Sequence, residues 1–321
     1  MLRKALIFLS ESNAAKAVVT KTPLRRMSSR FVPGEEVDDF LRAAEEANRL
    51  ELAVTGNYLG EAEHDERTAK DAVSAYLRIL DGIVANNLNG NISVKPTQVG
   101  LEIGKDFYKE NLRQLLDRAG EHDIFVRWDM ESSDWTQATL DAFEDLWAEG
   151  YRNMGPVLQS YLRRTMEDAL RMNELGARVR LCKGAYAEPP EVAFQDKAKV
   201  DSNFVEVSKA LLSDGKYPAL ATHDDEIIRT LLGFVEKEGI APDRFEFQML
   251  HGVRRDLQQK LRSDGYTVRV YVPFGESWYP YLMRRLAERP ANMLFFVGSV
   301  VRESPLRFLW PKKKQEQSES P

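Results

Sequence analysis

The sequence predicts a (β/α)8 barrel of the TIM type, and three observations predict it. Short runs rich in β-branched and aromatic residues alternate with amphipathic helical segments eight times after residue 49. Strict alternation indicates a parallel sheet, and eight units over roughly 250 residues is the size of such a barrel. No G-x-G-x-x-G motif follows the first run, which disfavours a doubly wound open sheet, the alternative fold for this alternation.

The composition is that of a soluble globular protein with a sizeable core, since 43% of the 321 residues are hydrophobic and 30% are charged. The net charge of -5 argues against a nucleic-acid partner. A single cysteine, Cys182, excludes an intramolecular disulfide and suits a reducing compartment. The four histidines show no zinc-binding spacing, so we expect no metal site. No run approaches the roughly 20 apolar residues of a membrane-spanning helix.

Three regions are expected along the chain. Residues 1–48 form an N-terminal helical segment, which starts with a short amphipathic helix rather than a signal peptide and continues in a second helix after Pro33-Gly34. Residues 49–303 form the barrel. Residues 304–321 are polar and charged and form a partly disordered tail.

The strands and helices follow from the periodicity of the apolar residues. The predicted strands are residues 50–59, 89–94, 124–130, 153–159, 178–185, 218–222, 245–250 and 267–272. The predicted helices are residues 35–48 before the first strand and 65–84, 106–119, 134–149, 163–175, a segment within 190–212, 225–238, 253–262 and 278–288 after the strands. We expect Asp134 to cap the helix that begins there and Gly176 to end the helix before it. We expect Pro273 and Gly275 to end the eighth strand.

Polar residues stand where most of the predicted strands end. They are Lys95, Asp129, Gln159, Lys183, Thr222-His223, Gln248 and Tyr271. Each one alone is explained by a loop boundary, a helix cap or a structural histidine. In a barrel, however, the carboxyl ends of the strands meet on one face, so together these residues predict a shared ligand site.

The last predicted helix carries an arginine pair on one face. Tyr281, Arg284, Arg285 and Glu288 fall at helical spacing. Two guanidiniums can clamp a carboxylate, although such a pair on a helix is more often a solvated basic patch. With Lys95, Arg180 and Lys183 the site is rich in cations, which indicates an anionic substrate and a phosphate-bearing cofactor.

Seven short segments carry a resemblance to a known family. They are ISVK (92–95), VRWDMESS (126–133), VRLCKGAY (179–186), ATHD (221–224), FEFQMLHG (245–252), VRVYVPFG (268–275) and YLMRRLAERPAN (281–292). Together they resemble the proline dehydrogenase family, flavoenzymes that oxidise L-proline. The likeness covers roughly residues 25–295, and the length is similar to that of the single-function bacterial type without an attached aldehyde dehydrogenase domain.

The resemblance implies a distorted barrel that holds FAD non-covalently, with the last helix over the site. It implies oxidation of L-proline to Δ1-pyrroline-5-carboxylate, the first step of proline catabolism to glutamate, with electrons passed from reduced flavin to a membrane quinone. The resemblance therefore also implies a cytoplasmic protein, peripheral at the inner face of the membrane, with a pyrroline-5-carboxylate dehydrogenase as downstream partner. A candidate for membrane contact is the aromatic and basic stretch Phe308, Leu309, Trp310, Lys312, Lys313 and Lys314, although packing on the barrel is the more usual role for an aromatic residue such as Trp310.

The resemblance also implies roles for single residues. Asp129, Arg180 and Tyr271 match catalytic positions, with Arg180 near flavin N5. The substrate-binding positions match Lys95, Tyr186, Leu250, Tyr271, Arg284 and Arg285. The flavin-binding positions match Met130, Gln159, Arg180, Lys183, Gly184, Ala185, Thr222, His223, Gln248 and Glu288.

Two positions depart from the family pattern and one bears on specificity. Ala187 stands where some relatives have tryptophan, so flavin stacking there is expected to differ. Cys182 replaces an aliphatic residue with little expected effect, since a buried cysteine behaves as a small hydrophobe. Tyr271 favours proline, because relatives that oxidise hydroxyproline tend to have a smaller residue there.

Two other functions fit the residues. An aldolase-like barrel would use Lys95 or Lys183 as a Schiff-base amine. A non-catalytic module would bind an amino acid or a flavin in the same pocket. Bound flavin argues against the first, and turnover of proline with an artificial acceptor argues against the second.

Overall fold

The structure is a computed structural model that describes residues 30–60 and 64–288, with the backbone alone for 284–288. The chain divides into two compact units. One is Pro33–Glu276, and the other combines Met1–Val32 with Ser277–Pro321. The predicted first helix and the predicted tail lie outside the described residues, and the predicted region limits at residues 48 and 303 stay predictions.

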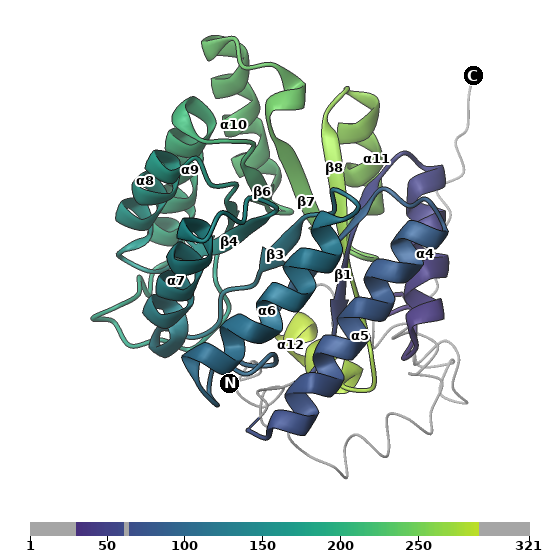
Figure 1. The fold of residues 1–321 in the computed structure, drawn as a ribbon. Coiled ribbons are helices and arrows are strands. Elements are labelled where there is room, and N and C mark those ends of the chain that lie inside the picture. The colour runs from purple at the N-terminus through teal and green to yellow at the C-terminus, as the bar shows by residue number, and fades with distance from the viewer. Residues whose placement is uncertain (1–29, 61–63, 289–321) are drawn as a thin grey trace, which may run out of the picture. The chain divides into compact units, whose positions relative to one another are not determined.

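Among the described residues, eight parallel strands form a closed barrel within the unit Pro33–Glu276 (Figure 1). Each strand pairs with the next along the chain, and the eighth pairs with the first, where Tyr271 lies opposite Thr55. The strands are β1 Ala53–Tyr58, β2 Gly90–Val94, β3 Val126–Trp128, β4 Met154–Gln159, β5 Arg180–Cys182, β6 Ala219–Ala221, β7 Glu246–Leu250 and β8 Thr267–Phe274. The predicted TIM-type barrel is confirmed.

Helices follow the first seven strands in turn and cover the outside of the barrel (Figure 1). They are α5 Glu66–Ala85, α6 Lys105–Gly120, α7 Ser133–Ala148, α8 Thr165–Leu175, α9 Lys197–Asp214, α10 Asp225–Glu238 and α11 Arg255–Ser263. A short 3-10 helix, Pro242–Arg244, precedes β7. Gly176 ends α8 in the left-handed conformation, as predicted.

Helix α4, Val37–Arg49, lies where a helix after β8 would lie in a regular barrel. It packs against β1, β8 and α5. The fully buried Phe40 ring stacks on Phe274 with 5.5 Å between the ring centroids. Gly56 leaves room for this ring, since a Cβ there would come within 2.9 Å of Phe40. A helix that precedes β1 in the sequence therefore completes the helical layer of the barrel.

Helix α12, Trp278–Glu288, follows β8 in the sequence and belongs to the other compact unit. Its limits are those that the sequence predicts. Its expected position over the site stays a prediction. Within the described residues, no helix is long and apolar enough to cross a membrane, and no group of three candidate ligands could hold a metal ion.

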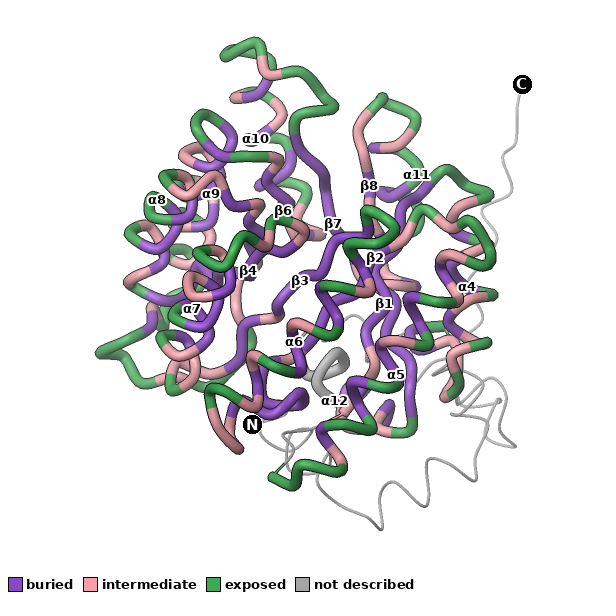
Figure 2. The backbone as a smooth tube through the Cα atoms, in the orientation of Figure 1, coloured by how far each residue is buried: buried purple, intermediate pink, exposed green. Residues whose placement is uncertain are grey.

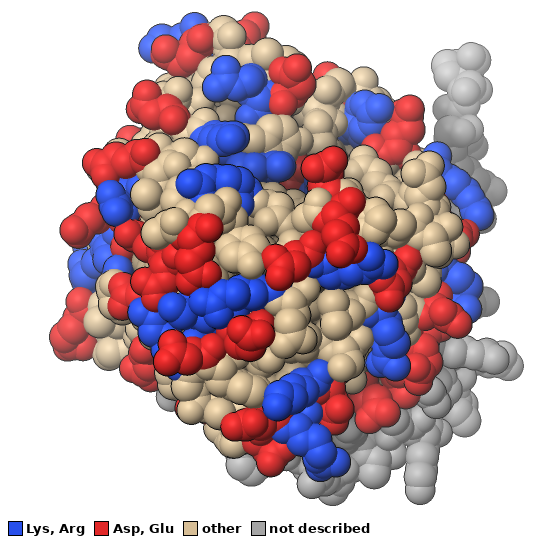
Figure 3. Space-filling view, viewed as in Figure 1, with Lys and Arg blue, Asp and Glu red and all other residues tan. Residues whose placement is uncertain are grey.

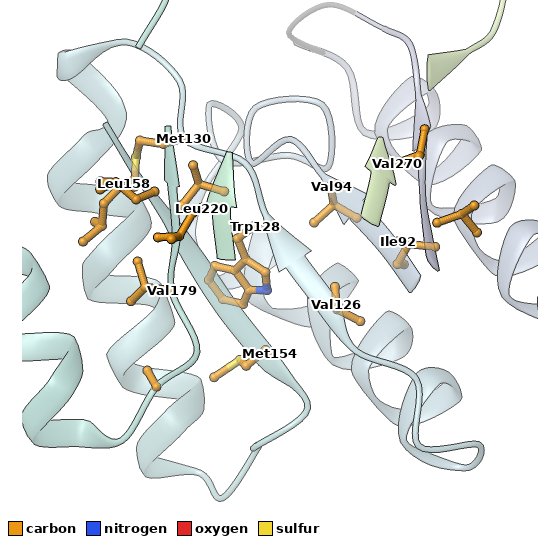
Figure 4. Packing of buried hydrophobic residues seen from close by; sticks show 14 of the residues in the cluster. Ile92, Val94, Val126, Trp128, Met130, Met154, Leu158, Val179, Leu220 and Val270 are labelled. Carbon is orange, nitrogen blue, oxygen red and sulfur yellow. The ribbon is translucent and has the colours of Figure 1, made fainter. Parts of the chain in front are cut away.

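The main hydrophobic core lies between the strands and the surrounding helices. Ile92 and Val94 of β2, with Val126 and Trp128 of β3, belong to it (Figure 4). The fully buried Trp128 ring meets Phe143 of α7 at 5.5 Å. The alternate residues of these strands point the other way, into the barrel. Most strand residues are therefore buried on both faces, as expected for a parallel sheet covered by helices (Figure 2).

Three local predictions differ from the structure. Ser132, not Asp134, is the N-cap residue of α7, and Asp134 lies in the first turn. Pro273 does not end β8, which continues to Phe274 because its carbonyl groups still accept from β1, and Leu59 N donates to Phe274 O at 2.7 Å. Strand β5 ends at Cys182, so residues 183–185 lie in the loop that follows.

Candidate active site

The carboxyl end of the barrel is tied together by Asp129, which directly follows β3. Its Oδ1 accepts hydrogen bonds from Ser93 Oγ at 2.7 Å and from Arg180 Nη1 at 2.8 Å. Its Oδ2 accepts from Tyr271 OH at 2.8 Å. Ser93 lies on β2, which is next to β3, whereas Arg180 on β5 and Tyr271 on β8 lie on strands that do not pair with β3, so their two contacts cross the barrel interior. The structure thus brings together the three residues predicted to be catalytic.

Arg180 is the central cation of this network, and its side chain is 5% exposed. Its Nη1 donates to Ser93 Oγ at 3.0 Å as well as to Asp129. Its Nε and Nη2 are buried and have no hydrogen-bond partner among the described residues. An unpaired guanidinium N–H in a buried site costs free energy, so these atoms call for an acceptor supplied by a ligand.

Tyr271 is fixed on both its hydroxyl and its ring. Burial, followed by the negative charge of Asp129, raises the pKa of Tyr271 well above its usual value. The phenol therefore stays protonated and donates a hydrogen bond to Asp129. The Arg180 guanidinium lies 5.4 Å from the centre of the Tyr271 ring. Tyr271 can accordingly offer a ligand its ring, but its hydroxyl proton is already used.

Ser93 belongs to this network, although the sequence did not single it out. It is fully buried in β2 between the core residues Ile92 and Val94. A serine within an apolar strand gives no sign of its partners. Its alternation with core residues would have placed it inside the barrel once β2 was known.

A second polar layer lies closer to the amino ends of the strands. Gln248 Nε2 donates to Glu246 Oε1, which also accepts from Arg269 Nε at 2.8 Å. Burial alone would raise the pKa of Glu246, but the charge and hydrogen bond of Arg269 lower it to about 2. Glu246 thereby fixes the amide of Gln248, and it is a second residue that the sequence did not single out.

Gln159, at the end of β4, donates from Nε2 to Glu131 O at 2.8 Å. The Glu131 carboxylate accepts from Thr97 N and Thr97 Oγ1, each at 2.8 Å. Burial raises the pKa of Glu131 and outweighs these hydrogen bonds. Glu131 joins the loops after β2 and β3. The sequence missed this residue, because no spacing relates it to Thr97.

Lys95 and Lys183 lie after β2 and β5. Lys95 Nζ donates to Gly60 O at 2.8 Å. Lys183 Nζ lies 3.1 Å from Asp224 Oδ2 and 2.5 Å from Asp201 Oδ1. An ammonium held between two carboxylates is a poor nucleophile, which speaks against Lys183 as a Schiff-base amine.

Thr222 and His223 directly follow β6, at the end of the strand where the sequence predicts them. Thr222 is buried, and its Oγ1 accepts from Asp224 N at 3.2 Å. His223 Nε2 accepts from Leu250 N at 3.0 Å. Because a backbone N–H donates, the proton of a neutral His223 ring lies on Nδ1. His223 thus connects the ends of β6 and β7.

The loop after β5 carries Gly184, Ala185 and Tyr186. Gly184 has a φ of +100°, and a Cβ there would overlap the Tyr161 ring at 2.2 Å. The family resemblance assigns Gly184 to flavin binding, and contact with Tyr161 by itself already requires a glycine at this position. Ala185 is exposed and Tyr186 is 42% exposed.

Two other groups of predicted residues lie apart from this network. Met130 is buried in the hydrophobic core (Figure 4), and its predicted flavin contact stays a prediction. The side chains of Arg284, Arg285 and Glu288 lie outside the part of the chain that the structure describes, although the α12 backbone carries all three.

Comparison with known proteins identifies the family. The family model described as proline dehydrogenase matches residues 40–297. Proline dehydrogenase 2 of Bacillus subtilis (strain 168) is 38% identical over 91% of this chain and 96% of its own length. The proline dehydrogenase of Deinococcus radiodurans is 35% identical over 94% of this chain and 98% of its own length.

Solved structures of proline utilization A (PutA) are similar in fold. The protein from Bdellovibrio bacteriovorus, inactivated by N-propargylglycine, has a TM-score of 0.81 and 25% identity, covering 100% of this chain and 41% of that one. A variant from Bradyrhizobium japonicum has a TM-score of 0.73 and 26% identity, covering 92% and 34%. This chain thus spans less than half of those solved chains. Because the family model matches most of the chain, the chain belongs to the proline dehydrogenase family, whose members are oxidoreductases that act on proline.

Proposed function

We propose that this chain oxidises L-proline to Δ1-pyrroline-5-carboxylate with non-covalently bound FAD and passes the electrons to a quinone. The observation that carries the proposal is the buried Arg180 guanidinium, whose Nε and Nη2 lack an acceptor within the described residues. The family assigns the chain to the first step of proline catabolism. Proline is then the substrate, and the cofactor and the electron acceptor are the proposed parts.

The residues present fit a flavin. The isoalloxazine ring offers acceptors at N5 and at its carbonyl groups, which match the two unpaired N–H positions of Arg180. The other residues proposed to hold FAD are Met130, Gln159, Lys183, Gly184, Ala185, Thr222, His223, Gln248 and Glu288. When bound, FAD would supply the acceptor for the hydride that leaves the substrate Cδ.

The chain's own residues bind and orient the substrate in this proposal. Arg284 and Arg285 grip the proline carboxylate, with Lys95 beside it, because guanidiniums bind carboxylates in a fixed geometry. Tyr271 offers its ring to the pyrrolidine, and Tyr186 and Leu250 help to enclose it. The amine must be neutral to lose hydride, and nearby cations lower the pKa of the substrate ammonium.

An absorption spectrum of the purified protein, recorded before and after anaerobic L-proline, tests the proposal. We expect a flavin spectrum that bleaches on addition of proline. A flavin that stays oxidised would contradict proline as substrate, and hydroxyproline would be tested next. A protein that binds no flavin even after addition of FAD would contradict the proposed cofactor and favour the alternative of a Schiff-base lysine.

We also propose that the chain works in the cytoplasm, against the inner face of a membrane that holds the quinone. The proposed contact is the aromatic and basic stretch in residues 308–314, which lies outside the described residues. Deleting this stretch should weaken binding to anionic vesicles measured by sedimentation. Unchanged vesicle binding would exclude the stretch as the contact.

A further inference from the structure

Ser93 is the one member of the Asp129 network that none of the predicted roles includes. Its hydroxyl lies 2.7 Å from Asp129 Oδ1 and 3.0 Å from Arg180 Nη1. Arginine is a donor only, so Ser93 Oγ must accept from Arg180 and give its single proton to Asp129. The direction of both hydrogen bonds is therefore fixed by the partners.

The position of Ser93 is as fixed as its hydrogen bonds. The residue is fully buried, and the preceding and following residues, Ile92 and Val94, are held in the hydrophobic core. Strand β2 pairs Ser93 with Arg127 of β3. A hydroxyl on such a strand gives Arg180 a rigid second acceptor beside Asp129.

The guanidinium of Arg180 is thereby divided into two parts. Nη1 donates to two protein oxygens, while Nε and Nη2 have no partner among the described residues. Two acceptors on Nη1 restrict rotation of the planar group much more than one acceptor does. The unpaired atoms then point in a set direction before a ligand binds, and this reduces the ordering required on binding.

We infer that Ser93 is a positioning residue, which holds the Arg180 guanidinium so that Nε and Nη2 are presented to the bound flavin. The inference rests on the proposed function, because it takes the flavin as the missing acceptor. Ser93 itself acts through Arg180 and Asp129. The recognised chemistry is an acceptor edge of the flavin ring, and electron density gained there on reduction is stabilised by the oriented cation.

Substitution of Ser93 with alanine tests the inference in the FAD-loaded protein. We expect kcat to fall about tenfold, as for one lost hydrogen bond to a charged group, with a smaller change in the proline KM. The reduction potential of the bound flavin should become more negative, and the FAD dissociation constant should rise. A purely structural serine would lower the melting temperature without moving the potential.

Two further variants separate the effect of the Ser93 hydroxyl from the effect of side-chain volume, and a third serves as a control. Ser93→Thr keeps the hydroxyl, so the reduction potential of the flavin should stay close to the wild-type value. Ser93→Cys has a similar volume but its thiol forms only weak hydrogen bonds, so the potential should shift as it does in Ser93→Ala. Ser208→Ala is the matched control, since Ser208 is also fully buried and its Oγ has no partner in the described chain. We expect that control to leave potential and turnover unchanged.

The outcomes are distinguishable. A wild-type protein that neither binds FAD nor oxidises proline overturns the proposed function. A wild type that does both, with Ser93→Ala and Ser93→Cys unchanged in potential and FAD affinity, overturns only the role of Ser93. If Ser93→Ala fails to fold, the comparison of Ser93→Thr with Ser93→Cys decides in the same way.

Discussion

Gly184 lies beside the site with its α-carbon against the ring of Tyr161. This close approach leaves no room for a Cβ, and the positive φ of +100° also disfavours any side chain. The loop after β5 can therefore turn where it does only with glycine. This loop carries the residues proposed to meet the flavin and the substrate.

Substitution of Gly184 with alanine should destabilise the protein by more than the cost of a positive φ alone. The matched control is Gly239→Ala, where φ is +65° and a new Cβ would meet nothing within 4 Å. We expect about 1 kcal/mol for the control and a clearly larger loss for Gly184, measured by urea unfolding. Equal losses would show that the loop relaxes away from Tyr161.

Arg284 gives a second prediction at the scale of a single residue. Substitution with lysine keeps the charge but removes the planar fork that binds a carboxylate bidentately. We expect the KM for proline to rise about tenfold with a smaller change in kcat, from initial rates with an artificial acceptor. An unchanged KM would remove Arg284 from the proposed clamp.

At the scale of elements, α4 completes the helical layer of the barrel although it precedes β1. Its buried side holds Phe40, Ala43, Ala44 and Ala47, and its other side faces solvent. The stacked rings of Phe40 and Phe274 join the element before the first strand to the last strand. Helix α4 therefore contributes to the stability of the barrel.

Substitution of Phe40 with alanine should cost about 3–5 kcal/mol in unfolding free energy, because it empties a fully buried site between α4 and β8. The exposed Glu46 on the same helix provides the control, and Glu46→Ala should stay within about 0.5 kcal/mol. Urea unfolding measures both. A small loss for Phe40→Ala would mean that α4 is dispensable to the barrel.

The order of strands and helices was predictable, because short runs rich in β-branched and aromatic residues alternate with helices that have an apolar stripe. Asp129 and Tyr271 were predictable from their places at the ends of predicted strands, whereas the role of Arg180 came from the family resemblance. Ser93 and Glu246 were not predictable, because no spacing in the sequence encodes their contacts. Arg180, a partner of Ser93, lies across the barrel, and Arg269, a partner of Glu246, lies on the neighbouring strand. The start of α10 at Asp225 was predicted correctly, but the pairing of Lys183 with Asp224 was not, because it joins the loops after β5 and β6 and no spacing encodes that contact.

At the scale of the whole molecule, charged side chains of both signs are interleaved over the surface viewed in Figure 3. Pairs such as Arg113 with Glu149, at 2.8 Å, link neighbouring helices. Exposed pairs of this kind contribute little, about 0–1 kcal/mol each. Larger pH effects on stability come from buried groups.

His251, which is partly buried, gives a larger effect than these exposed pairs, since burial and then the charge of Arg255 lower its pKa from 6.5 to about 4. Between these two values the unfolded chain binds a proton that the folded chain does not. Stability should therefore fall by about 3 kcal/mol as the pH drops from 6.5 to 4. Urea unfolding across this range should show a flatter dependence for His251→Asn, with exposed His122→Asn as control. An equal slope in all three proteins would contradict this.

The charged barrel interior has a consequence for how the strands align during folding. Arg127 lies inside the barrel, where its Nη1 donates to Pro156 O at 3.2 Å, while its neighbour Trp128 faces the helices. A slip of β3 by one residue would exchange the two directions. The guanidinium would then enter an apolar layer without partners, at a cost of several kcal/mol. The charged side chains inside the barrel thus fix the register of the strands, because a barrel with a misaligned strand would bury them without partners.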